Sequence, residues 1–143
     1  MRRYLLDTTP LTAYLQSQPP VVALVQPWLR RREAATSILV YGEVLEYLKG
    51  LSDYPQRHAQ LRRLLRAIIP TIVTHAVMEQ YADLRRQLRP PYGPGLIGDI
   101  DTLIAATALT NNFTLVTTDR DFERVPDLQL LLLDRTTFQP VPQ

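Results

Sequence analysis

The sequence of 143 residues contains no cysteine, which excludes a disulfide framework and a thiolate metal site. Its two histidines, His58 and His75, have no partner at metal-site spacing, so we interpret both as structural. A Walker-type glycine loop, a GxSxG motif and a zinc motif are also absent. No apolar run approaches the roughly 18 residues that indicate a membrane span. We expect no signal peptide, because Asp7 interrupts the first apolar stretch, and we therefore expect a cytoplasmic protein.

Positive charge is carried almost entirely by arginine and exceeds negative charge only slightly. The 16 Lys and Arg residues stand against 14 Asp and Glu residues, which gives a formal net charge of +2. Arginines cluster at residues 30–32, 62–66 and 85–89. Each cluster is either a solvated helix face or, because the planar guanidinium matches phosphate, a contact for RNA or an acidic partner.

Hydrophobic patterning predicts strands and helices that alternate along the chain. The predicted strands are residues 3–6, 34–37, 70–73, 113–117 and 128–133. The predicted helices are residues 10–15, 21–32, 38–49, 56–68, 75–89 and 101–110. This alternation indicates an α/β fold, with a parallel sheet covered by helices on both faces. The length suits a single domain over 1–143, with a core of about 3–133 and a loose tail at 134–143.

Four acids are predicted near the carboxyl edge of this sheet, where open α/β sheets bind their ligands. Asp7 ends the first strand, and Asp119 follows the fourth. Glu43 lies in the helix after the second strand, and Asp101 opens the helix that leads into the fourth strand. Residues that are scattered over more than a hundred positions are therefore expected to meet.

Helix capping is the ordinary alternative for some of these acids. Asp7 could simply cap the helix that follows it, and Glu43 could be a solvated acid beside an apolar face. Asp99 and Asp101 both precede an alanine-rich helix. Capping explains one of the two but does not readily explain both, and we favour Asp101 as the functional residue.

The acids are of a kind that suits a hard metal ion. Asp119 and Asp121 lie in a turn, where aspartate is common for structural reasons, so these two also have an ordinary explanation. If the carboxylates gather, their repulsion would force some to take up protons unless a cation joins them. Oxygen ligands alone favour Mg²⁺ or Mn²⁺, and such an ion can activate water for phosphodiester hydrolysis. The acids therefore predict a metal-dependent nuclease.

Four segments resemble, in order, the motifs of PIN-domain proteins. They are residues 4–8 (YLLDT), 37–43, 97–109 (IGDIDTLIAATAL) and 115–125 (LVTTDRDFERV). The resemblance extends over residues 4–133 and implies the PIN fold, with a central parallel sheet of about five strands. The length of the chain is similar to that of the VapC type, the toxin of toxin–antitoxin pairs.

The resemblance also implies function. It implies an endoribonuclease that hydrolyses RNA with Mg²⁺ or Mn²⁺, a cognate antitoxin protein as partner, and a homodimer. Thr117 would offer its hydroxyl to a water or to an acid. The acids implied as catalytic and as metal ligands are Asp7, Glu43, Asp101 and Asp119, with Asp121 as an accessory ligand.

Two departures and two alternatives stand beside this interpretation. Thr9 occupies a position where such proteins often have Asn, and the loop at 90–95 is long and proline-rich, so substrate approach could differ. A PIN-like module that binds RNA or protein without turnover is one alternative, against which the intact acidic set argues. A phosphotransfer receiver or an aspartate-based phosphatase is the other. Thr9 in place of a second Asp argues against a phosphatase, and the lack of any lysine after Lys49 argues against a receiver.

Overall fold

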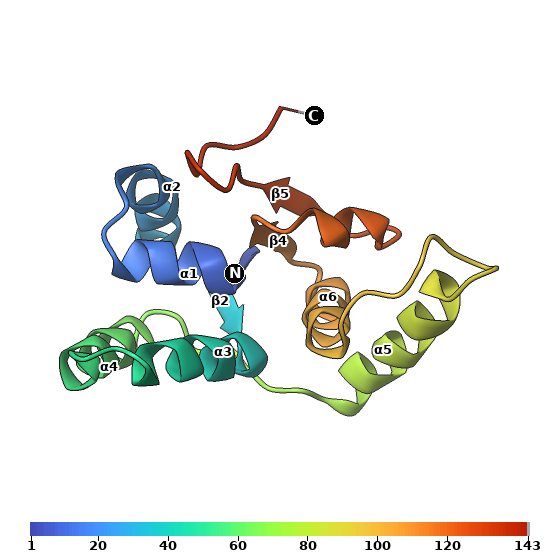
Figure 1. Cartoon of the computed structure of the whole chain (residues 1–143), viewed down its shortest axis with the longest axis horizontal. Helices are drawn as coiled ribbons and strands as arrows, with labels where there is room; N and C mark the ends of the chain where they lie inside the picture. The colour runs from blue at the N-terminus through green and yellow to red at the C-terminus, as the bar shows by residue number, and fades with distance from the viewer. Residues whose placement is uncertain (143) are drawn as a thin grey trace.

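Five short parallel strands form one sheet at the centre of the computed structural model, which describes residues 1–142 (Figure 1). The order of the strands across the sheet is β3-β2-β1-β4-β5. The central strands are apolar on both faces, which is the pattern of a parallel sheet that is covered on both sides. The strands are β1 (Tyr4–Leu6), β2 (Ala34–Ser37), β3 (Pro70–Thr71), β4 (Thr114–Thr117) and β5 (Leu130–Leu132).

The helices form two groups on opposite sides of the strands. Figure 1 shows α1 to α4 on one side, with α5 and α6 on the other. The predicted five-stranded parallel sheet with helices on both faces is thereby confirmed. No helix within residues 1–142 is long and apolar enough to cross a membrane. The helices are α1 (Thr8–Leu15), α2 (Pro19–Arg30), α3 (Ile38–Lys49), α4 (Tyr54–Leu64), α5 (His75–Leu88), α6 (Asp99–Asn111) and the 3₁₀ helix η1 (Arg120–Arg124).

Helix starts follow local chemistry that is visible in the sequence. The Ser37 hydroxyl accepts a hydrogen bond from the backbone N–H of Leu39 and caps α3. Helix α2 begins at Pro19, two residues earlier than predicted, because proline fits the first turn, where its missing N–H is not needed. Helix α6 also begins two residues early, since the Gly98 carbonyl accepts from the N–H of Thr102 at 2.8 Å. Asp99 and Asp101 therefore both lie in its first turn.

The topology reverses direction at β1. From β1 the chain crosses to β2 and then to β3 on one side, whereas β4 and β5 lie on the other side of β1. Because parallel crossovers are right-handed, connections that run in opposite directions lie on opposite faces of the sheet. The boundary between β1 and β4 is therefore the switch point at which α/β proteins form their ligand crevice. Leu6 pairs with Val116 across this boundary, so Asp7 and Thr117 leave the sheet at the same level.

The residues after β5 fold back onto that strand. The N–H of Val141 donates to the Leu132 carbonyl, and Leu133 forms a β-bridge with Pro140. The Asp134 carboxylate closes the turn between them by accepting hydrogen bonds from the backbone N–H groups of Thr136 and Thr137. We expected a loose tail here, whereas these hydrogen bonds hold it against β5.

Candidate functional site

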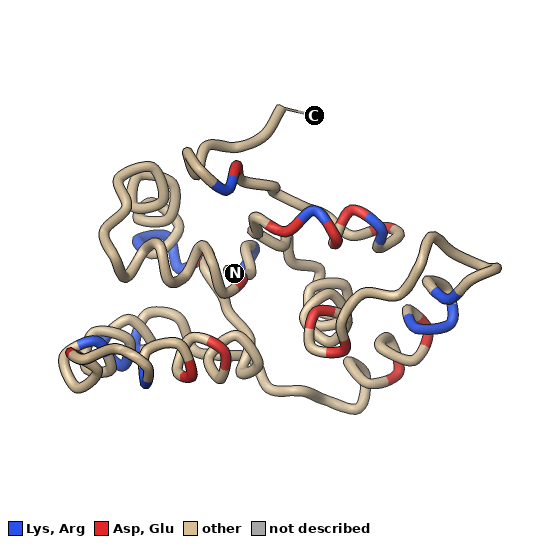
Figure 2. The backbone as a smooth tube through the Cα atoms, viewed as in Figure 1, with Lys and Arg blue, Asp and Glu red and all other residues tan. Residues whose placement is uncertain are grey.

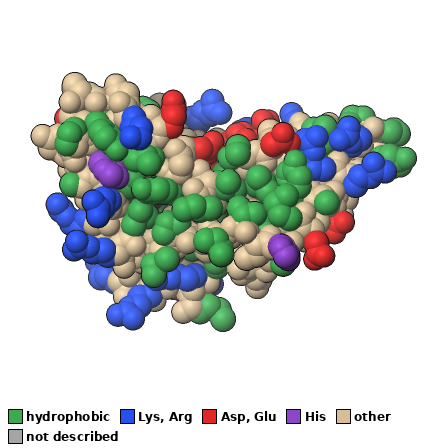
Figure 3. Space-filling model, turned by 90° about the horizontal axis from the view of Figure 1, so that it is seen from below, with side chains coloured by type: hydrophobic (Ala, Val, Ile, Leu, Met, Phe, Trp, Pro, Cys, Tyr) green, Lys and Arg blue, Asp and Glu red, His purple; other side chains and the backbone are tan. Residues whose placement is uncertain are grey.

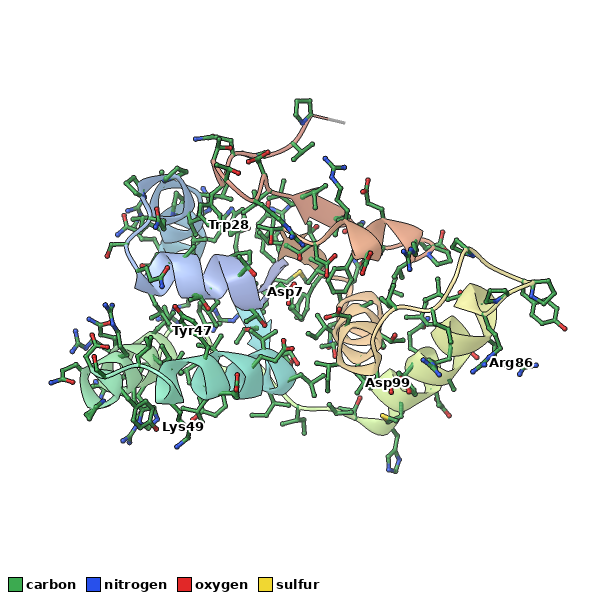
Figure 4. All side chains as sticks on the ribbon, viewed as in Figure 1. Asp7, Trp28, Tyr47, Lys49, Arg86 and Asp99 are labelled. Carbon is green, nitrogen blue, oxygen red and sulfur yellow. The ribbon has the colours of Figure 1, made fainter. Side chains whose placement is uncertain are left out.

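One pocket at the carboxyl edge of the sheet, with a volume of about 450 Å³, contains all four predicted catalytic acids. It lies at the switch point between β1 and β4, as the topology requires. Figure 4 shows Asp7 near the centre of the molecule, where α1 leaves the sheet. The residues that line the pocket are Asp7, Thr8, Thr9, Glu43, Asp101, Thr118, Asp119 and Arg135.

Asp7 is the most enclosed of the four acids, with 8% of its surface exposed. Burial raises the pKa of its carboxyl, and the hydrogen bond from Thr117 opposes that rise. The Thr117 hydroxyl donates to Asp7 Oδ2 at 2.7 Å and accepts from the backbone N–H of Asp119 at 3.1 Å. Although Asp7 precedes α1, its side chain makes no capping hydrogen bond, so capping does not explain it.

Glu43 reaches the pocket from the second turn of α3. Its Oε1 accepts a hydrogen bond of 2.6 Å from the hydroxyl of Thr8, in the first turn of α1. This bond joins two helices and fixes the carboxylate at the rim of the pocket. From the sequence, Thr8 was at most a candidate helix cap and had no predicted role in the site, although its position directly after Asp7 places its hydroxyl at the same edge.

Asp101 shows the electrostatic cost of gathering these acids. Its pKa rises to about 6, first because the carboxyl is partly buried and then because Asp7 and Asp119 lie nearby. Glu43 and Asp121 raise it further. Asp101 lies in the first turn of α6, where the positive end of the helix dipole favours a negative charge. Because that end is worth about half a charge, it offsets the repulsion from the other acids only in part.

Asp119 combines a structural bond with its place in the pocket. It is the N-cap of η1, and its Oδ1 accepts from the backbone N–H of Asp121 at 2.8 Å. One carboxylate oxygen of Asp119 therefore has the structural role that is common for aspartate in turns. The residue nevertheless lines the pocket.

Asp99 and Asp121, the two acids that our sequence analysis ranked lower, lie outside the lining of the pocket. Asp99 forms an ion pair of 3.0 Å with Arg85 and accepts from the hydroxyl of Tyr81, which directs it toward α5 (Figure 4). Asp121 faces Arg124 at 3.6 Å and lines a neighbouring pocket. In contrast, none of the four pocket acids forms an ion pair with Arg or Lys within residues 1–142.

The predicted arginine clusters lie elsewhere. Figure 2 shows Lys and Arg on the outer helices α2, α4 and α5, and acidic residues around the first turn of α6 and along η1. No residue of the three clusters lines the acidic pocket. A role of these clusters in binding RNA stays a prediction.

The chemistry of the pocket fits a hard divalent cation. Its potential ligands are oxygens only, and among the described residues none of its four acids forms an ion pair, although Arg135 also lines the pocket. No three acidic or histidine side chains of residues 1–142 form a group that could hold a metal ion directly. Because carboxylate-bound Mg²⁺ keeps several of its waters, Asp7, Glu43, Asp101 and Asp119 could reach the ion partly through water.

The fold and the pocket define an α/β protein with an acidic, all-oxygen site at its topological switch point. The family model of the PIN domain matches residues 4–128, so this chain belongs to the PIN-domain family. The predicted resemblance is thereby confirmed.

Relatives and solved structures agree with this assignment. Ribonuclease VapC19 of Mycobacterium tuberculosis is 33% identical over 127 residues, which cover 87% of this chain and 96% of that protein. The crystal structure of VapBC2 from Rickettsia felis, bound to a DNA fragment from their promoter, contains a similar chain. The match has a TM-score of 0.79 at 25% identity and covers 89% of this chain and 96% of that one. DNA-bound VapBC from Salmonella typhimurium gives a TM-score of 0.79 at 17% identity, covers 91% of this chain and 97% of that one, and shows the shared fold alone.

The raised pKa of Asp101 predicts how stability depends on pH. Between about pH 4, near the ordinary carboxyl pKa, and about pH 6, the folded chain binds more protons than the unfolded chain. This group therefore lowers the free energy of unfolding as pH rises through that window, and its contribution is constant above it. In EDTA, we expect the melting temperature of Asp101→Asn minus that of the parent to increase from pH 4 to 6 and then level off.

Asp83→Asn is the control, because it removes a carboxylate from an exposed position on α5. Its difference from the parent should stay flat across the same window. A flat difference for Asp101→Asn as well would contradict the raised pKa.

Proposed function

We propose that this chain is an endoribonuclease that hydrolyses RNA phosphodiester bonds with Mg²⁺ or Mn²⁺, and that it is the toxin of a toxin–antitoxin pair. The proposal rests chiefly on one observation, four carboxylates in one pocket at the switch point that form no ion pair within residues 1–142. Membership of the PIN-domain family and a relative that is named as a ribonuclease support the choice of RNA as substrate.

The four acids would divide two tasks. Asp7, Asp101 and Asp119 would hold the cation, directly or through water, and Asp121 would be an accessory ligand from the adjoining turn. When bound, the cation supplies positive charge for the phosphate and acidifies water. Glu43, which the Thr8 hydroxyl holds at 2.6 Å, is suited to orient the attacking water or to share in holding the cation. Thr117 orients Asp7 through its bond of 2.7 Å.

Neutralising one acid tests the catalytic assignment. We expect Asp7→Asn and Asp101→Asn to keep the fold and to cut RNA at least about 100-fold more slowly than the parent, because each loses a charged ligand of the cation. Cleavage of a labelled RNA in Mg²⁺ or Mn²⁺, with EDTA as the blank, measures this. Asp83→Asn should cut like the parent.

Calorimetry separates the enzyme from a catalytically silent module. The parent should bind Mn²⁺, and Asp101→Asn should bind it about 10- to 100-fold more weakly. A parent chain that neither binds Mn²⁺ nor cuts RNA would favour the silent binding module instead.

An antitoxin is proposed as the protein partner. The support is the similarity to a chain of VapBC2 at 25% identity, which extends over 96% of that chain. An active ribonuclease would damage the cell that makes it, so a partner that blocks the acidic pocket fits the proposed activity.

Growth measurements test the toxin assignment. Expression of the parent in a growing bacterium should arrest growth, whereas Asp7→Asn at equal abundance should not. Co-expression of a small protein encoded beside this chain should restore growth and form a stable complex with it. Equal arrest by the parent and Asp7→Asn would contradict a toxicity that depends on RNA cleavage.

A homodimer is proposed through an apolar surface beside the pocket. Ile38, Ile72 and Ile100 are 41%, 67% and 43% exposed. The pairing of Ser37 with Thr71 brings Ile38 and Ile72 together, and Ile38 and Ile100 line one shallow depression with Gly42. Figure 3 shows a broad hydrophobic area on this face.

Gly42 strengthens the case for a partner on this surface. A Cβ at this position would meet no atom within 4 Å, so packing within the chain does not require glycine. Glycine in the interior of a helix costs roughly 0.5–1 kcal/mol relative to alanine, and the close approach of another helix would offset that cost. A second copy of the chain supplies such a helix.

Sedimentation velocity tests the dimer. We expect the parent to sediment as a dimer and Ile72→Asp to shift toward the monomer, because a carboxylate would be buried without a partner. Tyr92→Asp introduces the same charge at an apolar residue that is 75% exposed in the loop after α5, and it should leave the dimer intact. A monomeric parent would contradict the proposal.

A further inference from the structure

Arg135 is the one basic side chain that lines the acidic pocket. It also lines the neighbouring pocket, of about 420 Å³, which is bordered by the segment after β4 and by the residues after β5. The two pockets share Thr118, Asp119 and Arg135, so Arg135 borders both of them. No role was predicted for this residue, because it falls in the tail that we expected to be loose.

The arginines near this edge differ in whether they form an ion pair with an acid of the chain. Arg120 forms an ion pair with Glu123 at 3.3 Å, and Arg124 pairs with Asp121 at 3.6 Å. Arg135 shares a pocket with four carboxylates, yet within residues 1–142 it forms no ion pair and no side-chain hydrogen bond. Its guanidinium, with five N–H donors, is therefore open to an anion from outside the chain.

The turn after β5 fixes the backbone that carries Arg135. Asp134 Oδ1 accepts from the N–H groups of Thr136 and Thr137 at 2.8 and 2.9 Å, and these bonds lower the pKa of its carboxyl. The N–H of Phe138 donates to the Asp134 carbonyl, and the Phe138 ring packs against the core. Hydrogen bonds of the residues before and after Arg135 thus hold its backbone beside the pocket.

We propose that Arg135 binds a backbone phosphate of the RNA, next to the one that is cleaved. This inference rests on the proposed ribonuclease function. A pocket of four carboxylates repels a phosphodiester, so a strand that passes through it needs positive charge on either side of the acids. Arginine can grip a phosphate through two parallel hydrogen bonds. The RNA strand would run from the acidic pocket across Arg135 into the neighbouring pocket, while Asp134 acts as a positioning residue.

Binding of a short single-stranded RNA by the Asp7→Asn chain, at a series of KCl concentrations in fixed Mg²⁺, tests this directly. Adding Arg135→Gln should weaken binding about 10-fold, and Arg135→Lys should recover part of the loss because it keeps the charge but not the fork. The slope of log affinity against log salt should become shallower by about 0.7, the value for one phosphate contact on a single strand. Arg57→Gln removes the same charge from an arginine that is paired with Asp53 at 3.0 Å on α4, outside both pockets, and should leave the slope unchanged.

Cleavage by otherwise unmodified chains gives a second readout. Arg135→Gln should lower kcat/KM about 10-fold, and Asp134→Ala should lower it less, with the Mn²⁺ affinity and melting temperature of Arg135→Gln equal to those of the parent. The inference is overturned if the salt slope of Arg135→Gln matches that of Arg57→Gln, or if Mn²⁺ affinity falls while the slope stays the same. If the parent binds RNA with the Arg135-dependent slope but does not cut it, the proposed activity is contradicted and the phosphate contact is still supported.

Discussion

The hydrogen bond of 2.7 Å between the Thr117 hydroxyl and the Asp7 carboxylate connects two residues that are 110 positions apart. It forms because β1 and β4 are neighbours and because Leu6 pairs with Val116, so the next residue of each strand emerges at the same level. The same hydroxyl accepts from the N–H of Asp119 and thereby sets the start of η1. One buried threonine thus joins the first strand, the fourth strand and the turn that carries the last acid of the pocket.

The price of this arrangement is electrostatic. Gathering Asp7 and Asp101 raises the pKa of both carboxyls, first through burial and then through the charges of the neighbouring acids. Elsewhere in the chain, acids such as Glu33 and Asp99 face arginines at 2.6 to 3.0 Å. A site that keeps its acids without basic partners stores repulsion, and the proposed cation would relieve it. Repulsion among the acids would then both lower the stability of the metal-free protein and raise its affinity for the cation.

Basic, acidic and apolar side chains gather on different parts of the molecular surface. Most arginines lie on the outer helices α2, α4 and α5 or just after their ends, and acidic residues lie around the first turn of α6 and along η1 (Figure 2). The apolar surface of Ile38, Ile72 and Ile100 adjoins the pocket, because Glu43 borders both. The proposed dimer contact, the proposed metal site and the proposed phosphate contact at Arg135 are therefore neighbours, so occupation of one can restrict access to the next.

The sequence by itself was enough to predict the strand and helix order, the parallel sheet and the four acids that line one pocket, because hydrophobic period and residues at the ends of strands and the starts of helices are local properties. Local signals also led to errors of a few residues, as at the start of α6, where the carbonyl of Gly98 begins the helix before Asp101. The sequence favoured Asp101 over Asp99, but only the tertiary structure showed where Asp99 goes, since its ion pair with Arg85 on α5 is a contact between helices. The same holds for Thr8 and Arg135. Their neighbours in the pocket come from distant parts of the chain, and no pattern along the sequence records a distance in space.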